Sequence, residues 1–465
     1  MDRLTPAPHT PPCDLVVEGG RLVTPDGVHD ATIAVHAGRI TALLPPTTPT
    51  PAAATRVDAR GRYVLPGLID SHVHFRTPGL THKEDWAHAG RAAAAGGVTT
   101  VIDMPNTQPP LHSAEAAHAK ADLIKGTSLV DYRFHMGVAP HTIGHLTDLD
   151  PRIATSVKVF MAGHHTAPDV IHDHATLSRI FATCADRGLR VVLHAEDTTV
   201  FHLLDDYLAA PRTYRDYETR RPRSGAIVAV ARILDLVREH GTHAHILHVS
   251  SAEECDLLAA ARHTGLPVTF ETTPHHLSFT HTDTQRTGAR TRISPSIRTQ
   301  ADQDRLWHAL TTGELATVGS DHAPHTIEEK TRPPAEAPPG LPGVQELLPV
   351  LLTGLRRRHP HRHLDDLLPL VASLCSARPA ELFGLAARKG RIAPGHDADL
   401  VVLDPDATWC PGPDTIQSKC GWSAYEGWTL TGRAETTIRR GEIIFDHAGG
   451  RFGSPTGDWL DPTAP

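Results

Sequence analysis

The stretch Leu65-Pro-Gly-Leu-Ile-Asp-Ser-His-Val-His-Phe decides how we interpret the fold. Its apolar half predicts a buried strand, and His72 and His74 follow at the strand end. Side chains two positions apart on a strand point to the same face, so both imidazoles can bind one metal ion. A bare His-x-His also arises by chance in a chain with 34 histidines. The pair therefore needs support from the rest of the sequence.

Apolar, strand-like runs alternate with Ala/Leu/Arg-rich helical stretches after this strand. The alternation is typical of repeated βα units around a parallel sheet. We count eight such strands and predict an α/β fold with a (β/α)8 TIM-like barrel over residues 65–392. A barrel of this kind places its active site at the C-terminal ends of its strands. The predicted strands end near His72 and His74, Asn106, Val138, Lys158, His194, His248, Glu271 and Asp321.

The two ends of the chain have a different residue pattern, in which short strand-forming runs are broken by Gly and Pro. Residues 14–18 and 31–36 are such runs near the N-terminus, and residues 399–403 and 436–445 repeat the pattern near the C-terminus. We predict that residues 1–64 and 393–465 together form one small β-sandwich that flanks the barrel.

Composition excludes several classes of partner. The 45 basic and 53 acidic residues give a formal charge of −8, and no basic cluster is dense enough to follow a phosphate backbone. No apolar run is long enough to cross a bilayer, and residues 1–13 lack the apolar core of a signal peptide. The six cysteines are scattered without Cys-x-x-Cys spacing. We expect a cytoplasmic protein with reduced thiols, and neither nucleic acid nor membrane as a partner.

Three further polar residues end separate predicted strands: His194, His248 and Asp321. With His72 and His74 they make four imidazoles and one carboxylate at the mouth of one barrel. Such a nitrogen and oxygen ligand set suits Zn²⁺ and is acceptable to Mn²⁺, Co²⁺ or Fe²⁺. The sequence therefore predicts a metal site.

Lys158 lies inside an apolar strand, where an unpaired ammonium is costly to bury. The chain contains 38 arginines and only seven lysines, so a lysine at this place calls for a chemical reason. A neutral lysine amine adds CO2 to form a carbamate that can bridge two metal ions, whereas an arginine stays protonated. An ion pair with a nearby carboxylate is the alternative explanation.

Several segments, in their order and spacing, resemble dihydroorotases and their relatives, the hydantoinases and allantoinases, which form the cyclic amidohydrolase branch of the amidohydrolase superfamily. The resemblance covers nearly the whole barrel and both flanking segments. The segments are Gly67-Leu-Ile-Asp-Ser-His-Val-His-Phe-Arg, Gly96-Gly-Val-Thr-Thr-Val-Ile-Asp-Met-Pro-Asn-Thr, Val157-Lys-Val-Phe-Met, Glu271-Thr-Thr-Pro-His-His-Leu, Ser320-Asp-His-Ala-Pro-His and Gly395-His-Asp-Ala-Asp-Leu-Val.

The resemblance implies two zinc ions bridged by a carbamate on Lys158 and by a hydroxide, with Asp321 moving the proton between that hydroxide and the departing nitrogen. The implied metal ligands are His72, His74, Lys158, His194, His248 and Asp321. The family also implies a homo-oligomer, a dimer or a tetramer. The expected substrate is a small molecule that carries a carboxylate.

Arg76, Asn106 and His325 resemble the carboxylate clamp of dihydroorotases, which allantoinases and hydantoinases typically lack. Ser294, in Ser294-Pro-Ser-Ile-Arg, replaces the asparagine usual in dihydroorotases, so a shorter hydroxyl would contact the substrate there. We further expect residues 328–340 to form the loop that closes over the substrate, although a plain surface linker is the alternative.

Three functions follow from these residues. The first is dihydroorotase, which reversibly hydrolyses L-dihydroorotate to N-carbamoyl-L-aspartate in pyrimidine synthesis. The second is another cyclic amidohydrolase, namely an allantoinase, a hydantoinase or a specialised biosynthetic enzyme, as Ser294 and the altered loop after Lys158 favour. The third is an inactive assembly subunit, ranked last because every ligand position is filled. His164 and His165 in that loop have a minor claim to a metal or substrate role.

Overall fold

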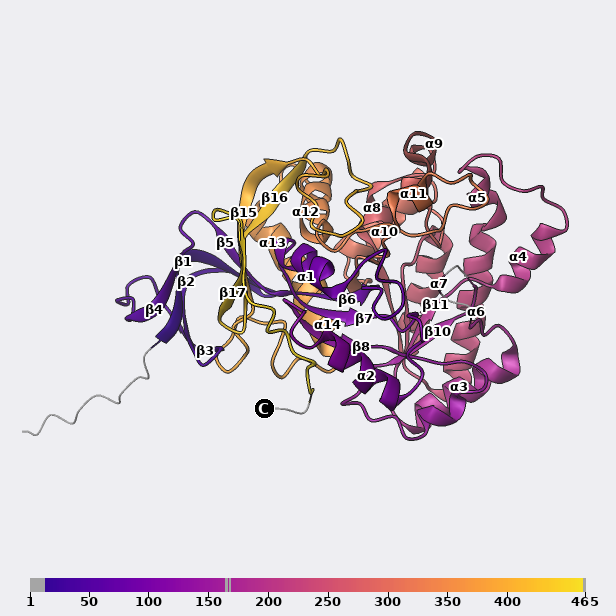
Figure 1. Ribbon diagram of the computed structural model, residues 1–465, viewed down its shortest axis with the longest axis horizontal. Coiled ribbons are helices and arrows are strands. Elements are labelled where there is room, and N and C mark those ends of the chain that lie inside the picture. Colours follow the sequence, from indigo (N-terminus) through magenta and orange to yellow (C-terminus); the bar gives the residue numbers. More distant parts are fainter. Residues whose placement is uncertain (1–12, 164–165, 167–168, 463–465) are drawn as a thin grey trace, which may run out of the picture.

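The computed structural model describes residues 13–163, 166 and 169–462. His164 and His165 lie outside the described residues. Eight strand positions run parallel in register around a barrel, which Figure 1 shows beside a separate β-sheet. The barrel strands are β6 (Leu68–Val73), β7 (Val98–Asp103), β8 (Asp131–Phe134) continued by β9 (Met136–Gly137), β10 (Val157–Phe160), β11 (Val191–His194), β12 (Ala244–Ile246), β13 (Val268–Thr272) and β14 (Thr317–Val318).

A parallel bridge between Val73 and His322 closes the circle, because it joins the end of the first strand to the segment after the last. The predicted TIM-like barrel is therefore confirmed. The third strand is split at His135, whose Nε2 lies 2.9 Å from the carbonyl oxygen of Ser71. Almost every barrel strand residue is buried, as expected for a parallel sheet covered by helices.

Helices cover the outside of the barrel, and several begin at side-chain caps. The capping box of Ser251 and Glu254 starts α7, for example. The helices are α1 (Trp86–Ala95), α2 (Ala114–Ile124), α3 (His174–Asp186), α4 (Thr198–Asp205), α5 (Asp216–Arg220), α6 (Arg223–His240), α7 (Ala252–His263), α8 (Pro274–Ser278), α9 (Asp283–Thr287), α10 (Gln300–Thr311), α11 (Ile327–Lys330), α12 (Leu347–Arg358), α13 (Leu364–Ala372) and α14 (Arg378–Leu382).

The two ends of the chain share one flanking sheet, as predicted. Its C-terminal strand β15 pairs antiparallel with β5, which pairs in turn with β1, so indigo and yellow strands lie side by side in Figure 1. The strands are β1 (Cys13–Thr24), β2 (Gly27–His36), β3 (Arg39–Leu44), β4 (Ala53–Asp58), β5 (Tyr63–Pro66), β15 (Leu400–Trp409), β16 (Leu430–Arg439), β17 (Glu442–Asp446) and β18 (Arg451–Phe452).

A buried lysine joins this sheet to the barrel. Lys389 Nζ lies 2.7 Å from Asp131 of β8, and 2.6 Å and 3.1 Å from Asp399 and Asp397, which precede β15. All four side chains are nearly inaccessible to solvent. The six cysteines are free, and none of the described helices is long and apolar enough to cross a membrane.

Candidate metal centre

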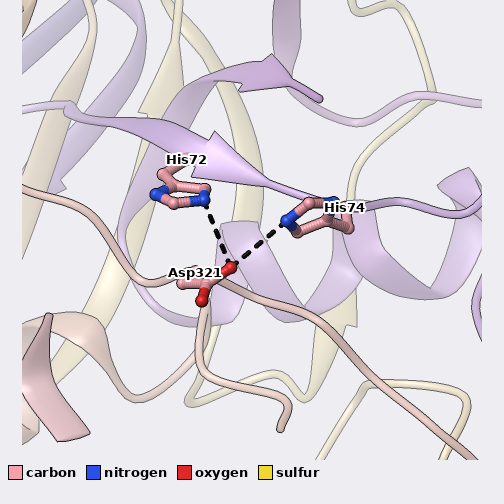
Figure 2. A group of neighbouring side chains, drawn as sticks. All are labelled: His72, His74 and Asp321. Atoms are coloured by element: carbon pink, nitrogen blue, oxygen red, sulfur yellow. Dashed lines mark ion pairs between the residues drawn. The ribbon is translucent and has the colours of Figure 1, made fainter. Parts of the chain in front are cut away.

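His72, His74 and Asp321 come together at the mouth of the barrel (Figure 2). The Nε2 atoms of both histidines lie 3.2 Å from Asp321 Oδ1. Burial lowers the pKa of His74 to about 3, so the imidazole is neutral, as a metal ligand must be. Burial opposes ionisation of Asp321, but the adjacent histidines hold the pKa of its carboxyl well below the ordinary value.

The opposite ring nitrogens of the two histidines are held by the neighbouring strands. His72 Nδ1 lies 2.6 Å from Glu271 Oε1 of β13, and His74 Nδ1 lies 2.7 Å from Asn106 Oδ1 after β7. An acceptor on one nitrogen fixes the proton there and leaves the other nitrogen free to bind a cation. Both Nε2 atoms therefore present lone pairs to the same point as Asp321.

His194 and His248 make the second half of the cluster. His194 Nδ1 lies 3.0 Å from His248 Nε2, while His194 Nε2 lies 2.9 Å from the buried carboxylate of Glu196. The His72 and His248 rings are 5.3 Å apart between centroids, so both halves are contiguous. Burial opposes ionisation of Glu196, but Arg221 and His194 lower the pKa of its carboxyl to about 2.

Lys158 lies in β10 and is 1% exposed. No carboxylate of the described residues lies within ion-pair distance of its ammonium, and Nζ stands 4.5 Å from the centre of the Phe160 ring. Burial lowers the pKa of Lys158 to about 7, although Asp321 and Glu271 oppose the shift. The ion pair considered as the alternative for Lys158 is absent among the described residues, and a neutral amine is accessible near pH 7.

Arg76 is the most unusual polar group of the cavity above this cluster. Its guanidinium is 2% exposed, has no carboxylate within ion-pair distance in the described part of the chain, and leaves Nε without a partner. Nη1 donates to Thr166 Oγ1 at 3.4 Å. Burial lowers the pKa of Arg76 to about 10, so it is still a cation at neutral pH. An anionic group in the cavity would compensate this charge.

Eight of the ten predicted site residues line one cavity. They are His72, His74, Arg76, Lys158, His194, His248, Ser294 and Asp321. The Ser294 hydroxyl also bonds the hydroxyl of Tyr217. The other two predicted residues lie next to the cavity. Asn106 accepts from His74 and donates through Nδ2 to Thr166 Oγ1 at 2.9 Å, and it lines an adjoining hollow.

His325 lies behind the cavity wall, with both ring nitrogens occupied. Nε2 donates to the carbonyl of Pro339 at 3.0 Å, so Nδ1 accepts from Lys83 Nζ at 3.0 Å. Pro339 and Gly340 line the cavity, and His325 therefore supports its wall. The carboxylate-binding roles of Asn106 and His325 stay predictions, and in this conformation their polar atoms are engaged by protein groups.

Sequence reasoning missed the carboxylate Glu196 and its partner Arg221. Arg221 Nη1 donates to Glu196 Oε2 at 2.8 Å, and the same oxygen faces His194. A charged residue two positions after a predicted ligand, in His194-Ala-Glu, was visible in the sequence. Its arginine partner, 25 residues away, was not.

The cluster fits a divalent metal centre. In the first half, the Nε2 lone pairs of His72 and His74 face one carboxylate oxygen with no proton between them, because their protons lie on Nδ1. In the second half, two imidazole nitrogens lie 3.0 Å apart in the same cavity. The donors are neutral imidazoles and a carboxylate, which suit zinc and similar ions. Lys158 stands in the same cavity.

Comparison with known proteins gives one consistent family. Residues 63–444 match the model of the Amidohydrolase family. An allantoinase of Streptomyces avermitilis is 38% identical over 454 residues, which cover 96% of this chain and 98% of that protein. A dihydroorotase of Halobacterium salinarum is 37% identical over 396 residues, or 84% of this chain and 88% of that protein.

Solved structures agree. An L-hydantoinase (dihydropyrimidinase) from Arthrobacter aurescens superposes with a TM-score of 0.91 at 29% identity, over 97% of this chain and 100% of that one. Family, relatives and fold neighbour span both the barrel and most of the flanking sheet. This chain therefore belongs to the amidohydrolase family, within the branch that holds the allantoinases, dihydroorotases and hydantoinases.

Proposed function

We propose that this amidohydrolase opens the ring of a cyclic amide or ureide by adding water across a C–N bond at a metal centre. The observation that carries the proposal is the convergence of His72, His74 and Asp321 on one point in the cavity that Lys158 also lines. The filled ligand positions argue against an inactive assembly subunit.

We propose two divalent cations, zinc in the first place, held by His72, His74, His194, His248 and Asp321, with a CO2-derived carbamate on Lys158 as the bridge. Such cations polarise an amide carbonyl and lower the pKa of a water to near neutrality. The lowered pKa of Lys158, about 7, supports the carbamate because CO2 adds only to the neutral amine.

Asp321 is the proposed proton carrier. Its side chain is 12% exposed, whereas those of His72 and His74 are 1% and 7% exposed, so it is the most accessible of the three. Its carboxylate takes a proton from the attacking water and returns it to the departing ring nitrogen.

Two classes of ring are candidate substrates. The names of the relatives favour the neutral ring of allantoin. Relatives named allantoinase, from Streptomyces avermitilis, Rubrobacter xylanophilus and Deinococcus radiodurans, match nearly the full chain at 36–38% identity. This supports the second function of our sequence analysis over dihydroorotase, which stood first there. Ser294, which replaces the asparagine usual in dihydroorotases, agrees with it.

Arg76 favours the other class, a ring with a carboxylate such as L-dihydroorotate. A buried guanidinium without a carboxylate partner is stabilised by an anionic ligand. In this version Ser294 contacts the ring amide, and Asn106 and His325 complete the clamp after their present hydrogen bonds are exchanged. The dihydroorotase of Halobacterium salinarum supports this candidate.

The experiment compares kcat/KM for allantoin, L-dihydroorotate and 5-substituted hydantoins, using wild-type protein, Arg76→Met and the exposed control Arg179→Met. If dihydroorotate is the substrate, Arg76→Met raises its KM about ten-fold or more, the loss expected for a charged hydrogen bond, and leaves metal content unchanged. Preference for allantoin with an unaffected Arg76→Met variant assigns the neutral ring. Inactivity on every ring by metal-loaded protein contradicts the proposal.

Four further expectations belong to the proposal. The protein works in the cytoplasm as a homodimer or homotetramer, without nucleic acid or membrane partners. Its units are residues 1–64 and 393–465 as the flanking β module and residues 65–392 as the catalytic barrel. Light scattering on the purified protein measures the oligomeric state directly.

A further inference from the structure

A second cavity, of about 600 Å³, opens on the side of α4 and α5. We call it the arginine chamber, because Arg220, Arg221 and Arg292 contribute to its wall together with Tyr217, Phe201 and Asp205. Its volume is within the range of small-molecule sites. None of these residues belongs to the lining of the catalytic cavity.

The chamber has an excess of positive charge. Arg220 bonds Asp205, and Arg221 donates to Glu196 at 2.8 Å, so two guanidiniums have carboxylate partners. Arg292 has none within ion-pair distance among the residues that the structure describes, although it is only 8% exposed. Its Nη1 donates to the carbonyl of Pro334, and its buried Nε has no hydrogen-bond partner.

The positive charge of Arg292 is only partly compensated by its surroundings. Its guanidinium carbon lies 4.2 Å from the centre of the Tyr217 ring, which gives partial compensation only. Burial lowers the pKa of Arg292, and the like charge of Arg221 adds to the effect. An oxyanion near both guanidiniums would relieve the repulsion and occupy the unpaired donors.

Two bonded connections join the chamber to the catalytic site. Arg221 bonds Glu196, and Glu196 holds the ring of His194 at 2.9 Å. In addition, the Tyr217 hydroxyl bonds Ser294, which lines the catalytic cavity. A ligand that competes with Glu196 for Arg221 would loosen the support of His194.

We propose that the arginine chamber binds a small carboxylate-bearing molecule through Arg292 and Arg221, and that its occupancy weakens metal binding at His194 through Glu196. A carboxylate is the ligand class because its two oxygens match the guanidinium fork. The binding step is independent of the proposed function. The coupling step rests on the proposed metal role of His194.

Isothermal titration of the full-length protein with succinate, and separately with inorganic phosphate, tests the binding step. Wild type binds succinate, and Arg292→Met weakens binding about ten-fold or more, as for a lost charged hydrogen bond. Arg286→Met, whose side chain is 62% exposed and pairs with Asp283 outside the chamber, is the matched control and binds as wild type. Tighter binding of phosphate than of succinate overturns the carboxylate assignment.

Two more variants locate the site. Ala335→Glu places a carboxylate on an exposed loop position of the chamber wall, where misfolding is of little concern, and should block succinate. Arg76→Met alters the catalytic cavity only and should leave succinate affinity unchanged. No binding by wild type, normal binding by both chamber variants, or loss of binding in Arg76→Met overturns the proposal.

Zinc affinity, measured by chelator competition with and without succinate, tests the coupling step. We expect succinate to lower the zinc affinity of wild type about three-fold or more and to leave that of Ala335→Glu unchanged, since outer partners of metal-binding histidines affect affinity by 10–100-fold. Unchanged zinc affinity in wild type saturated with succinate overturns the coupling. This result is distinct from failure of ring hydrolysis, because no turnover is measured.

Discussion

Arg76, His248 and Asp321 have positive φ angles of 61°, 38° and 44°. For residues with a Cβ this region is unfavourable, at a cost of about 1–3 kcal/mol each, and such residues gather at functional sites. All three line the catalytic cavity, and each lies just beyond the end of a barrel strand. The fold therefore accepts backbone strain at the places where donors and ligands face the cavity.

Replacing Lys158 tests the proposed bridge. Lys158→Ala should lower kcat/KM by more than about 100-fold, beyond the 10–100-fold typical of groups outside the ligand shell, with partial rescue by short carboxylic acids. Lys158→Arg should not restore activity, because its guanidinium stays protonated. Lys125→Ala, an exposed lysine, is the control. Unchanged activity of Lys158→Ala would eliminate the role of Lys158.

Glu346 provides a pH-dependent prediction away from the metal cluster. Burial raises the pKa of its carboxyl from 4.5 to about 7, and Oε1 has no hydrogen-bond partner among the residues that the structure describes. The folded state thus binds a proton that the unfolded state releases, so this group's contribution to stability decreases as pH rises from about 4.5 to 7.

Glu346→Gln removes this titration. The variant should gain stability over wild type as pH rises, from near zero at pH 4.5 to about 2–3 kcal/mol above pH 7. Urea unfolding at several pH values measures the difference. Glu239→Gln, whose side chain is 56% exposed, should give a flat difference. A flat difference for Glu346→Gln as well would contradict the assignment.

The sequence predicted the candidate ligands because most strand ends carried a polar residue in the local pattern. It did not reveal which residues hold these side chains in place by hydrogen bonds. Asn106 is the only asparagine of the chain, and its position after a strand predicted a substrate contact. In the structure its carboxamide holds His74 and Thr166. Which neighbour a side chain meets depends on barrel register and loop geometry, and neither is encoded in residue spacing.

At the scale of elements, one lysine fixes two walls of the catalytic cavity. Lys330, the last residue of α11, is 4% exposed and donates to the carbonyls of Arg292, Pro338 and Gly340 at 3.2, 2.9 and 2.7 Å. Arg292 precedes the Ser294 segment, and Gly340 lines the cavity itself. The predicted closing segment, residues 328–340, is therefore anchored to the substrate wall by a buried ammonium.

Lys330→Met should disorder this wall and leave the metal ligands in place. We expect KM for the ring substrate to rise about ten-fold, because three hydrogen bonds from a charged donor are lost, while zinc content stays that of wild type. Lys125→Met is the exposed control. Loss of zinc together with activity would show that the Lys330 hydrogen bonds support the metal ligands as well, contrary to this account.

Element prediction succeeded where periodicity was strong. The eight strands and the sharing of one sheet by both chain ends followed from apolar runs and their spacing. The shortness of β14, which has two residues, and the break at His135 between β8 and β9 did not, because the extent of short pairing segments depends on neighbouring strands rather than on local sequence.

At the scale of the whole molecule, Lys389 connects barrel and flanking sheet through Asp131, Asp397 and Asp399. Burial disfavours the charge of Lys389, but these carboxylates raise the pKa of its ammonium. Arg439 and Arg440 approach Asp131 from the sheet side, at 3.7 and 3.2 Å. The joint is thus a buried charge network, and its residues lie far apart in the sequence.

Lys389→Met should lower the free energy of unfolding by about 3–5 kcal/mol, because among the described residues Lys389 is the cation that pairs with the buried carboxylate of Asp399. Guanidinium unfolding, followed by tryptophan fluorescence and circular dichroism, measures the change. Arg391→Met, whose side chain is 44% exposed and pairs with Glu381, is the neighbouring control. A loss for Lys389→Met no greater than for the control would mean that the network contributes nothing to stability.

The most direct test of the central claim measures bound metal and ring hydrolysis in the same sample. Protein stripped by a chelator is reconstituted with increasing zinc in the presence of bicarbonate, and opening of allantoin, L-dihydroorotate and 5-substituted hydantoins is followed. We predict that the stripped protein is inactive and that hydrolysis of one ring rises with bound zinc up to two ions per chain. Full activity without metal, or inactivity of the loaded protein on every ring, would contradict the account.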